Sequence, residues 1–205
     1  MVVKYPFGPP IYEDEITDEF RQILLSACSQ SKKNPSNIGG ELAGNIEDQL
    51  ELPVDPRQFI EHINPYIEYY LQETLAMDGV TKTHLKKLCF NLGGGPWVNF
   101  QRKHEFNPVH IHSGELSCVI MIDVPEVIAE EKSPKSNMPC PGKLEFIHGT
   151  DGYNYQAGYK VKPKTGQIYL FPATLRHTVY PFTSDVERIT MSFNVYDIQY
   201  EEELL

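Results

Sequence analysis

A series of short β-rich segments fills the second half of the chain. This feature of the sequence constrains the possible folds most strongly. The segments are rich in large apolar and β-branched residues and are separated by Gly, Pro and Asn, which is typical of a β-sandwich or barrel. The expected strands are Leu85–Leu92, Trp97–Arg102, Leu116–Val124, Leu144–Ile147, Gln167–Phe171 and Arg188–Tyr196. The stretch 125–142 is expected to be a loop, and 150–163 a loop or an irregular hairpin.

Two amphipathic helical patterns precede the β segments. Thr17 can cap the first helix, and Asp55 with Pro56 predicts the start of the second, which Pro65 is expected to kink. The expected helices are Asp18–Ser29 and Pro56–Leu71. The stretch 30–51, rich in Ser, Asn and Gly, is expected to be an irregular excursion. The fold class is therefore α+β, with N-terminal helices bracing an antiparallel sandwich.

The length of the chain fits one domain. It has 205 residues, of which 40% are hydrophobic and 22% charged, a composition typical of a globular protein with a substantial core. We expect residues 1–84 to form a helical support, residues 85–196 to form the β core and residues 197–205 to form an acidic tail.

The net charge and the cysteine content limit which binding partners and which cellular compartment are expected. The net charge of -10 argues against non-specific binding to nucleic acid or anionic lipid, so nucleic acid is an unlikely partner, while a homodimer stays open. No apolar run approaches the roughly 18 residues of a membrane helix, and the start lacks the layout of a signal peptide, which predicts a cytoplasmic protein. The cysteines form no CxxC pair and are expected to be reduced thiols. They are Cys28, Cys89, Cys118 and Cys140.

Three histidines are spaced as metal ligands. His110 and His112 are separated by one residue, and side chains at positions i and i+2 of a strand point to the same face. Because two imidazoles hold a metal only weakly, a third ligand is needed. His177, 65 positions after His112, can supply it if distant strands become neighbours in a sandwich. Three other histidines lie in helical or charged surroundings and are expected to be ordinary polar residues: His62, His84 and His104.

Arg188 begins a strand in which polar and apolar residues alternate. In one interpretation its polar row faces water, as in many antiparallel sheets. In the other, the strand of Arg188 forms a hairpin with the strand of His177, joined by a turn at 183–185. Arg188 could then bind the far carboxylate of a metal-chelating diacid through two parallel hydrogen bonds.

The order HxH, His, Arg resembles the iron(II)- and 2-oxoglutarate-dependent oxygenases of the double-stranded β-helix fold, whose usual pattern is HxD or HxE, then His, then Arg. Further segments resemble the 2-oxoglutarate oxygenases found in bacteria and phages, over about residues 85–196. These segments are Trp97–Phe100, Asn107–Pro108, Leu116–Ile120, Gly166–Pro172, His177–Val179 and Arg188–Asn194. The resemblance implies a jelly-roll, cupin-like core, with Fe(II) as cofactor and 2-oxoglutarate as cosubstrate.

The resemblance also implies an activity and a role for each matched residue. The activity is that of a dioxygenase, by default a hydroxylase, which uses 2-oxoglutarate and dioxygen on an unidentified substrate. The implied metal ligands are His110, His112 and His177. The implied cosubstrate residues are Arg188, with Thr190 or Ser192, and more weakly Asn99, Ser117 and Asn194.

One position departs from the family pattern, because His112 stands where a carboxylate is usual. Three imidazoles can hold iron(II) and still leave positions open. Glu115, or more distantly Asp151, could supply the carboxylate instead. The stretches 30–51 and 125–142 are long enough to cover the metal and to select the substrate. Two other functions stay open: a cupin-like domain that binds a metal or small acid without oxidation, and an interaction domain whose histidines are incidental.

Overall fold

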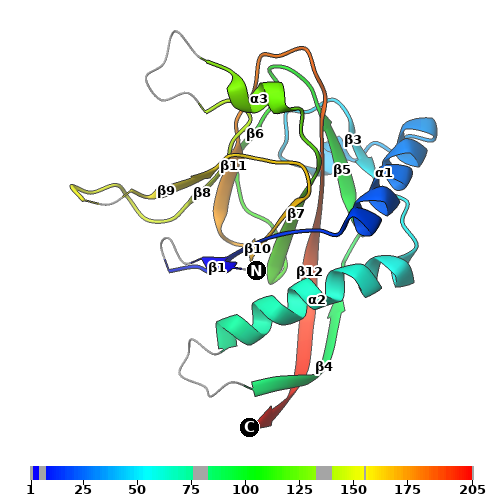
Figure 1. The fold of residues 1–205 in the computed structure, drawn as a ribbon, viewed down its shortest axis with the longest axis vertical. Coiled ribbons are helices and arrows are strands. Elements are labelled where there is room, and N and C mark those ends of the chain that lie inside the picture. The colour runs from blue at the N-terminus through cyan, green and yellow to red at the C-terminus, as the bar shows by residue number, and fades with distance from the viewer. Residues whose placement is uncertain (1, 5–7, 76–82, 133–139, 155, 205) are drawn as a thin grey trace.

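Two antiparallel sheets face each other, and helices pack on the outer face of the larger one (Figure 1). The computed structural model describes residues 2–4, 8–75, 83–132, 140–154 and 156–204. The larger sheet has the strand order β1-β2-β10-β7-β12-β5-β3, with β4 paired to β12, and the smaller sheet has the order β6-β11-β8-β9.

The strands are β1 (Val2–Lys4), β2 (Ile11–Glu15), β3 (Gln49–Glu51), β4 (Thr83–Asn91), β5 (Trp97–Gln101), β6 (Asn107–His110), β7 (Leu116–Asp123), β8 (Leu144–Ile147), β9 (Gly158–Val161), β10 (Gln167–Pro172), β11 (Arg176–Val179) and β12 (Arg188–Leu204). The helices are α1 (Asp18–Lys33), the short 3-10 helix η1 (Gly39–Glu41), α2 (Pro56–Leu75) and α3 (Glu126–Glu130). Among the residues that the structure describes, no helix is long and apolar enough to span a membrane.

The central strand β7 is apolar along nearly its whole length because both of its faces are buried. Cys118 and Ile120 belong to the core between the larger sheet and the helices. Val119 and Met121 point the other way, into the core between the two sheets. One sheet therefore separates two apolar layers, and the inner layer is the one that surrounds the candidate site.

Strand β12 divides its side chains between the same two layers. Phe193 packs outward, edge-to-face against Phe59 of α2 at a ring distance of 5.3 Å. Arg188, Thr190 and Ser192 point inward and are only 2%, 7% and 5% exposed. The interpretation that this polar row faces water is therefore wrong.

The two helices begin where the sequence predicts. The Thr17 hydroxyl accepts a hydrogen bond from the Phe20 N–H, and the Asp55 carboxylate accepts one from the Gln58 N–H, so that each caps a free donor of the first turn. Helix α1 ends four residues later than expected, and α2 passes through Pro65 without a break.

Several short strands were not predicted. The expected helical support also supplies β2 and β3 to the larger sheet, and β6, β9 and β11 each have only four residues. The residues expected to form an acidic tail continue β12 through Leu204 and pair with β4. This extension bends at Asp197, whose φ is 53°, and the Glu115 carboxylate accepts a hydrogen bond from the following Ile198 N–H.

The predicted hairpin between the strands of His177 and Arg188 is wrong. His177 lies on β11 in the smaller sheet and Arg188 lies on β12 in the larger one. The connection crosses from one sheet to the other, and the Glu131 carboxylate holds its turn through the backbone N–H groups of Thr183 and Ser184. The two residues therefore lie on opposing walls of the space between the sheets.

Candidate metal centre

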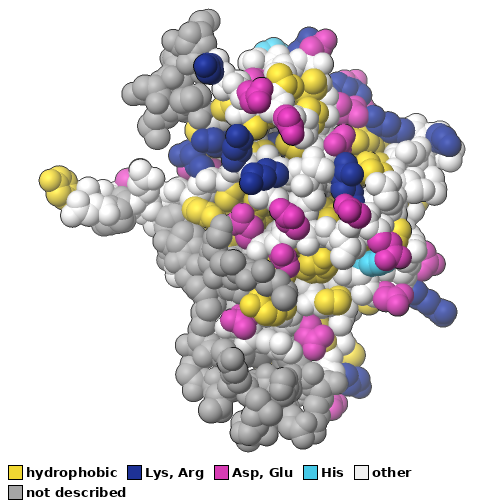
Figure 2. Space-filling view, in the orientation of Figure 1, with side chains coloured by type: hydrophobic (Ala, Val, Ile, Leu, Met, Phe, Trp, Pro, Cys, Tyr) yellow, Lys and Arg dark blue, Asp and Glu magenta, His cyan; other side chains and the backbone are white. Residues whose placement is uncertain are grey.

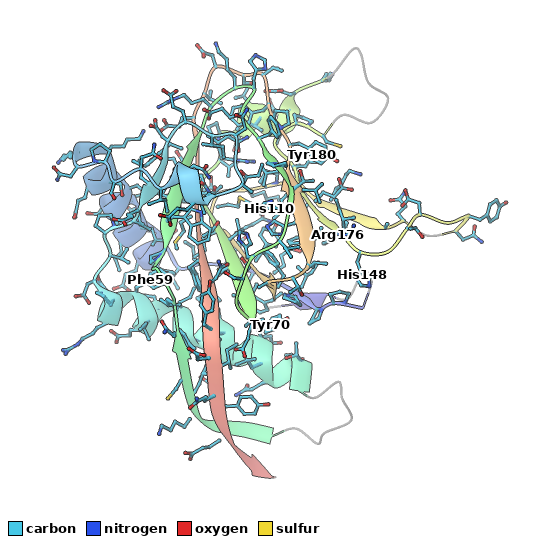
Figure 3. The ribbon with its side chains drawn as sticks, turned by 180° about the vertical axis from the view of Figure 1, so that it is seen from behind. Phe59, Tyr70, His110, His148, Arg176 and Tyr180 are labelled. Carbon is cyan, nitrogen blue, oxygen red and sulfur yellow. The ribbon has the colours of Figure 1, made fainter. Side chains whose placement is uncertain are left out.

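His110, His112 and His177 converge, as the sequence predicts. One ring nitrogen of each lies within 4.8 Å of the other two, and the ring centroids are 4.2–5.0 Å apart. His110 and His177 are direct partners across β6 and β11, and His112 follows two residues after His110. Figure 3 shows His110 among the strands, whereas the exposed His148 lies farther out. In the described residues, this is the one cluster of its kind.

Backbone carbonyls fix the orientation of two of these rings. His110 Nδ1 lies 2.7 Å from the Pro108 carbonyl oxygen, and His177 Nδ1 lies 2.9 Å from that of Leu175. Because a carbonyl only accepts, each Nδ1 carries the hydrogen and donates it. The Nε2 lone pair of each ring is therefore free to bind a metal.

Burial keeps the three imidazoles uncharged. It lowers the pKa of His177 to about 3 and that of His112 to about 4, with neighbouring histidines adding to both effects. Burial also lowers the pKa of His110. At neutral pH all three rings are therefore neutral, the form that coordinates a metal ion.

The two acidic alternatives lie outside the cluster. Glu115 is exposed and its carboxylate accepts from the Ile198 N–H, while Asp151 accepts from the Ala157 N–H at 2.6 Å. The residues present thus fit an iron(II) ion held by three neutral nitrogen donors, with positions left open for other ligands.

Arg188 lies in an inner pocket next to the histidines and has no anionic partner in the described structure. Its guanidinium donates to the Gly142 carbonyl and the Gln101 side chain, and its Nε has no partner. Burial lowers its pKa to about 10, so the group stays charged at neutral pH. A buried, uncompensated cation is costly, and an anionic ligand would relieve that cost.

The other predicted residues divide between three places. Thr190, Ser192 and Asn99 line the inner pocket, and Gln49 Nε2 donates to Asn99 Oδ1 at 2.9 Å. Asn194 lines an adjoining outer pocket. Ser117 lines neither pocket and donates to Asn194 Oδ1 at 2.9 Å.

The inner pocket is narrow, about 40 Å3, and part of the predicted excursion closes it. Residues 42–44 line it beside Gln49 and Asn107, two amides whose buried oxygens have no partner among the described residues. A five-carbon diacid needs more space than this, so part of the lining must move when it binds beside Arg188. Gln49 gives no sequence signal, because it lies in a stretch without periodicity.

The outer pocket is larger, about 410 Å3, and opens beside His110 and His112. Trp97, His110 and His112 line both pockets. Residues 42–43 do so too, which agrees with the expectation that the 30–51 stretch covers the centre. Within the second expected cover, residues 125–142, residues 133–139 lie outside the described residues.

A family comparison relates the chain to the iron(II)- and 2-oxoglutarate-dependent oxygenases. Residues 95–194 match the family described as "Putative 2OG-Fe(II) oxygenase". The matched range contains all three histidines and Arg188. This part of the chain is thus similar to the 2OG-Fe(II) oxygenases, a family whose description names Fe(II) and 2-oxoglutarate.

Two solved structures share the fold at low sequence identity. A prolyl-4-hydroxylase of Pseudomonas putida is 14% identical with a TM-score of 0.53, and the match covers 90% of this chain and 91% of that one. A prolyl hydroxylase of Trichoplax adhaerens, in complex with a hypoxia inducible factor peptide, is 11% identical with a TM-score of 0.51, covering 91% and 83%. These likenesses confirm the predicted jelly-roll fold. A comparison with curated proteins gives no match.

Proposed function

We propose that this protein is a hydroxylase in which His110, His112 and His177 hold iron(II) and Arg188 anchors 2-oxoglutarate. The observation that carries the proposal is one pocket with three neutral imidazoles at one end and a buried, uncompensated guanidinium in its wall. A metal-chelating diacid satisfies both ends at once.

The side chains bind and orient 2-oxoglutarate. Iron(II), when bound, supplies the activation of dioxygen that is coupled to decarboxylation of 2-oxoglutarate. Arg188 would pair with the carboxylate far from the metal, and the hydroxyl of Thr190 or Ser192 can donate a further hydrogen bond to the same diacid. The narrow inner pocket excludes water from this pairing, which strengthens it.

Succinate formation from 2-oxoglutarate is the test. Wild-type protein should form succinate and carbon dioxide only with added iron(II) and dioxygen, and His177→Ala should form neither. A cupin-like domain would bind the metal without forming succinate, and an interaction domain would bind neither metal nor diacid. An anaerobic crystal soak with iron(II) and 2-oxoglutarate would show the ligands directly.

We also propose a cytoplasmic location, supported by four cysteines without a disulfide.

Acidic and basic side chains are interspersed over the face in Figure 2, which supports the prediction that nucleic acid is not a partner. Cell fractionation, a DNA-binding assay and analytical ultracentrifugation would test the location, the nucleic-acid prediction and the open question of a homodimer.

A further inference from the structure

The inner face of the larger sheet changes its charge from one end to the other. The β3–β5 and β5–β12 registers place directly paired side chains in rows on this face. The rows are Gln101 with Arg188, then Gln49 with Asn99 and Thr190, then Glu51 with Trp97 and Ser192. The row at one end thus carries a buried cation and the row at the other end an exposed carboxylate, with Trp97 beside it.

Trp97 connects the candidate metal ligands to Glu51. Its ring centroid lies 5.9 Å from that of His112, and Glu51 is its direct partner across β3 and β5. A molecule that lies along the indole therefore has one end near the histidines and the other end near a carboxylate.

A second carboxylate lies on the same pocket, at Glu41 of η1. Both Glu41 and Glu51 are exposed, and neither side chain has a hydrogen bond or ion pair with the described residues. The lining of the outer pocket contains no Lys or Arg among the described residues. The pocket therefore offers negative charge without an internal counter-ion.

A fixed tyrosine forms another aromatic wall. The Tyr196 hydroxyl lies 2.7 Å from Ser113 Oγ, and its ring packs between two glycines. A Cβ at Gly93 would lie 2.6 Å from the ring, and one at Gly114 3.2 Å from it. Only glycine leaves room for the ring here, so Tyr196 is held in place. Aromatic faces attract cations, and Trp97 provides the strongest such face.

We propose that the outer pocket binds its substrate through an alkylammonium group, held by Glu51 and Glu41 against Trp97 and Tyr196. This inference rests on the proposed function. An aliphatic C–H bond would then lie between the ammonium group and the histidines. The reaction balances as R–H + O2 + 2-oxoglutarate → R–OH + succinate + CO2: one oxygen atom enters the new C–O bond and the other enters succinate.

Trp97 is the single tryptophan of the chain, so its fluorescence reports directly on this pocket. The titration uses protein with iron(II) and 2-oxoglutarate under anaerobic conditions, which prevents turnover. The probes are Nα-acetyl-lysine amide, the uncharged Nα-acetyl-norleucine amide and the anionic Nα-acetyl-glutamate amide. We expect saturable binding of the lysine probe, at least about threefold tighter than the norleucine probe, and no binding of the glutamate probe.

Glu51→Gln should weaken binding of the lysine probe by at least about threefold and leave the norleucine probe unchanged. Glu61→Gln, which removes an exposed charge from α2, is the matched control and should change neither. A pentapeptide with a central lysine, compared with free lysine, distinguishes a protein side chain from a small amine as the source of the group.

Equal binding of the lysine and norleucine probes, or an unchanged lysine affinity in Glu51→Gln, would overturn the inference. Succinate formation without added substrate tests the proposed function separately. If succinate forms but the probes bind equally, only the alkylammonium inference fails. If the lysine probe is preferred but no succinate forms, the cation site stands and the hydroxylase proposal fails.

Discussion

The two ends of the inner sheet face hold charge in opposite ways. At one end Arg188 is 2% exposed and pairs only with neutral oxygens, and at the other end Glu51 lies in solvent. Removing the partner of a buried charge costs several kcal/mol, whereas an exposed ion pair is worth about 1 kcal/mol or less. The buried end is therefore suited to one obligatory anion, and the open end to weaker selection among substrates.

Among the substitutions considered, loss of the buried cation Arg188 should have the largest effect on ligand binding. Arg188→Met should lower the affinity for 2-oxoglutarate by about two to three orders of magnitude, because a buried charge pair loses one partner, at a cost of about 3–5 kcal/mol. The affinity for iron(II) should not change, since the guanidinium does not contact the histidine cluster. Calorimetry with each ligand measures both, with Arg57→Met on the exposed surface of α2 as the control. An unchanged 2-oxoglutarate affinity would contradict the anchoring role.

Across from this face, His112 distinguishes a three-histidine centre from a carboxylate centre. His112→Ala should weaken iron(II) binding by at least about tenfold, and His112→Asp should preserve or strengthen it by restoring the usual carboxylate. Glu115→Gln should leave iron binding intact, because Glu115 holds the Ile198 N–H. Anaerobic iron(II) titrations of these variants distinguish His112 from Glu115 as the third ligand. Full iron(II) affinity in both His112→Ala and Glu115→Gln would refute both assignments.

The pH dependence of stability tests how strongly burial affects the histidines on the facing sheet. In the unfolded chain histidine takes up a proton near pH 6.5, whereas folded His112 and His177 do so only near about 4 and about 3. The unfolded state therefore binds more protons in this window. The unfolding free energy of metal-free protein should fall as the pH drops from about 6.5 to about 4, by up to about 1.4 kcal/mol per pH unit for each residue.

Chemical denaturation at several pH values measures this slope. His177→Gln should flatten it, and His148→Gln, at an exposed position, should not. A slope that is equally steep in His177→Gln would show that other groups cause the acid sensitivity.

Binding of 2-oxoglutarate in the inner pocket beside Arg188 should depend on residues 42–44, which line that pocket. A Cβ at Gly44 would lie 2.2 Å from Asn107 Oδ1 and 2.7 Å from Gln49 Nε2, so these two side chains, which line the inner pocket, must move. Gly44→Ala should therefore weaken 2-oxoglutarate binding by about tenfold, the effect of about 1.4 kcal/mol. Gly40→Ala, whose Cβ meets no atom within 4 Å, is the control and should bind normally. Equal affinities in the two variants would show that residue 44 does not limit the pocket.

Features that depend on a few consecutive residues could be predicted from the sequence, whereas features that depend on the pairing of distant strands could not. The i, i+2 rule is a property of one strand, so the shared direction of His110 and His112 could be derived directly. The crossing between sheets depends on the whole topology, so the partner strand of Arg188 was predicted wrongly. Gln49 belongs to a three-residue strand, which is too short for alternation to be detected. Its place beside Asn99 is set only by pairing of β3 with β5.

The hydrogen bonds of His110 and His177 have an evolutionary consequence. Each ring is oriented by the carbonyl two positions earlier in its own strand segment, at Pro108 and Leu175. The hydrogen bond that orients each ring is thus made within three consecutive residues, with a backbone carbonyl and not a side chain as its acceptor. Substitutions around the pocket can therefore accumulate and alter what it accepts while these two hydrogen bonds are retained.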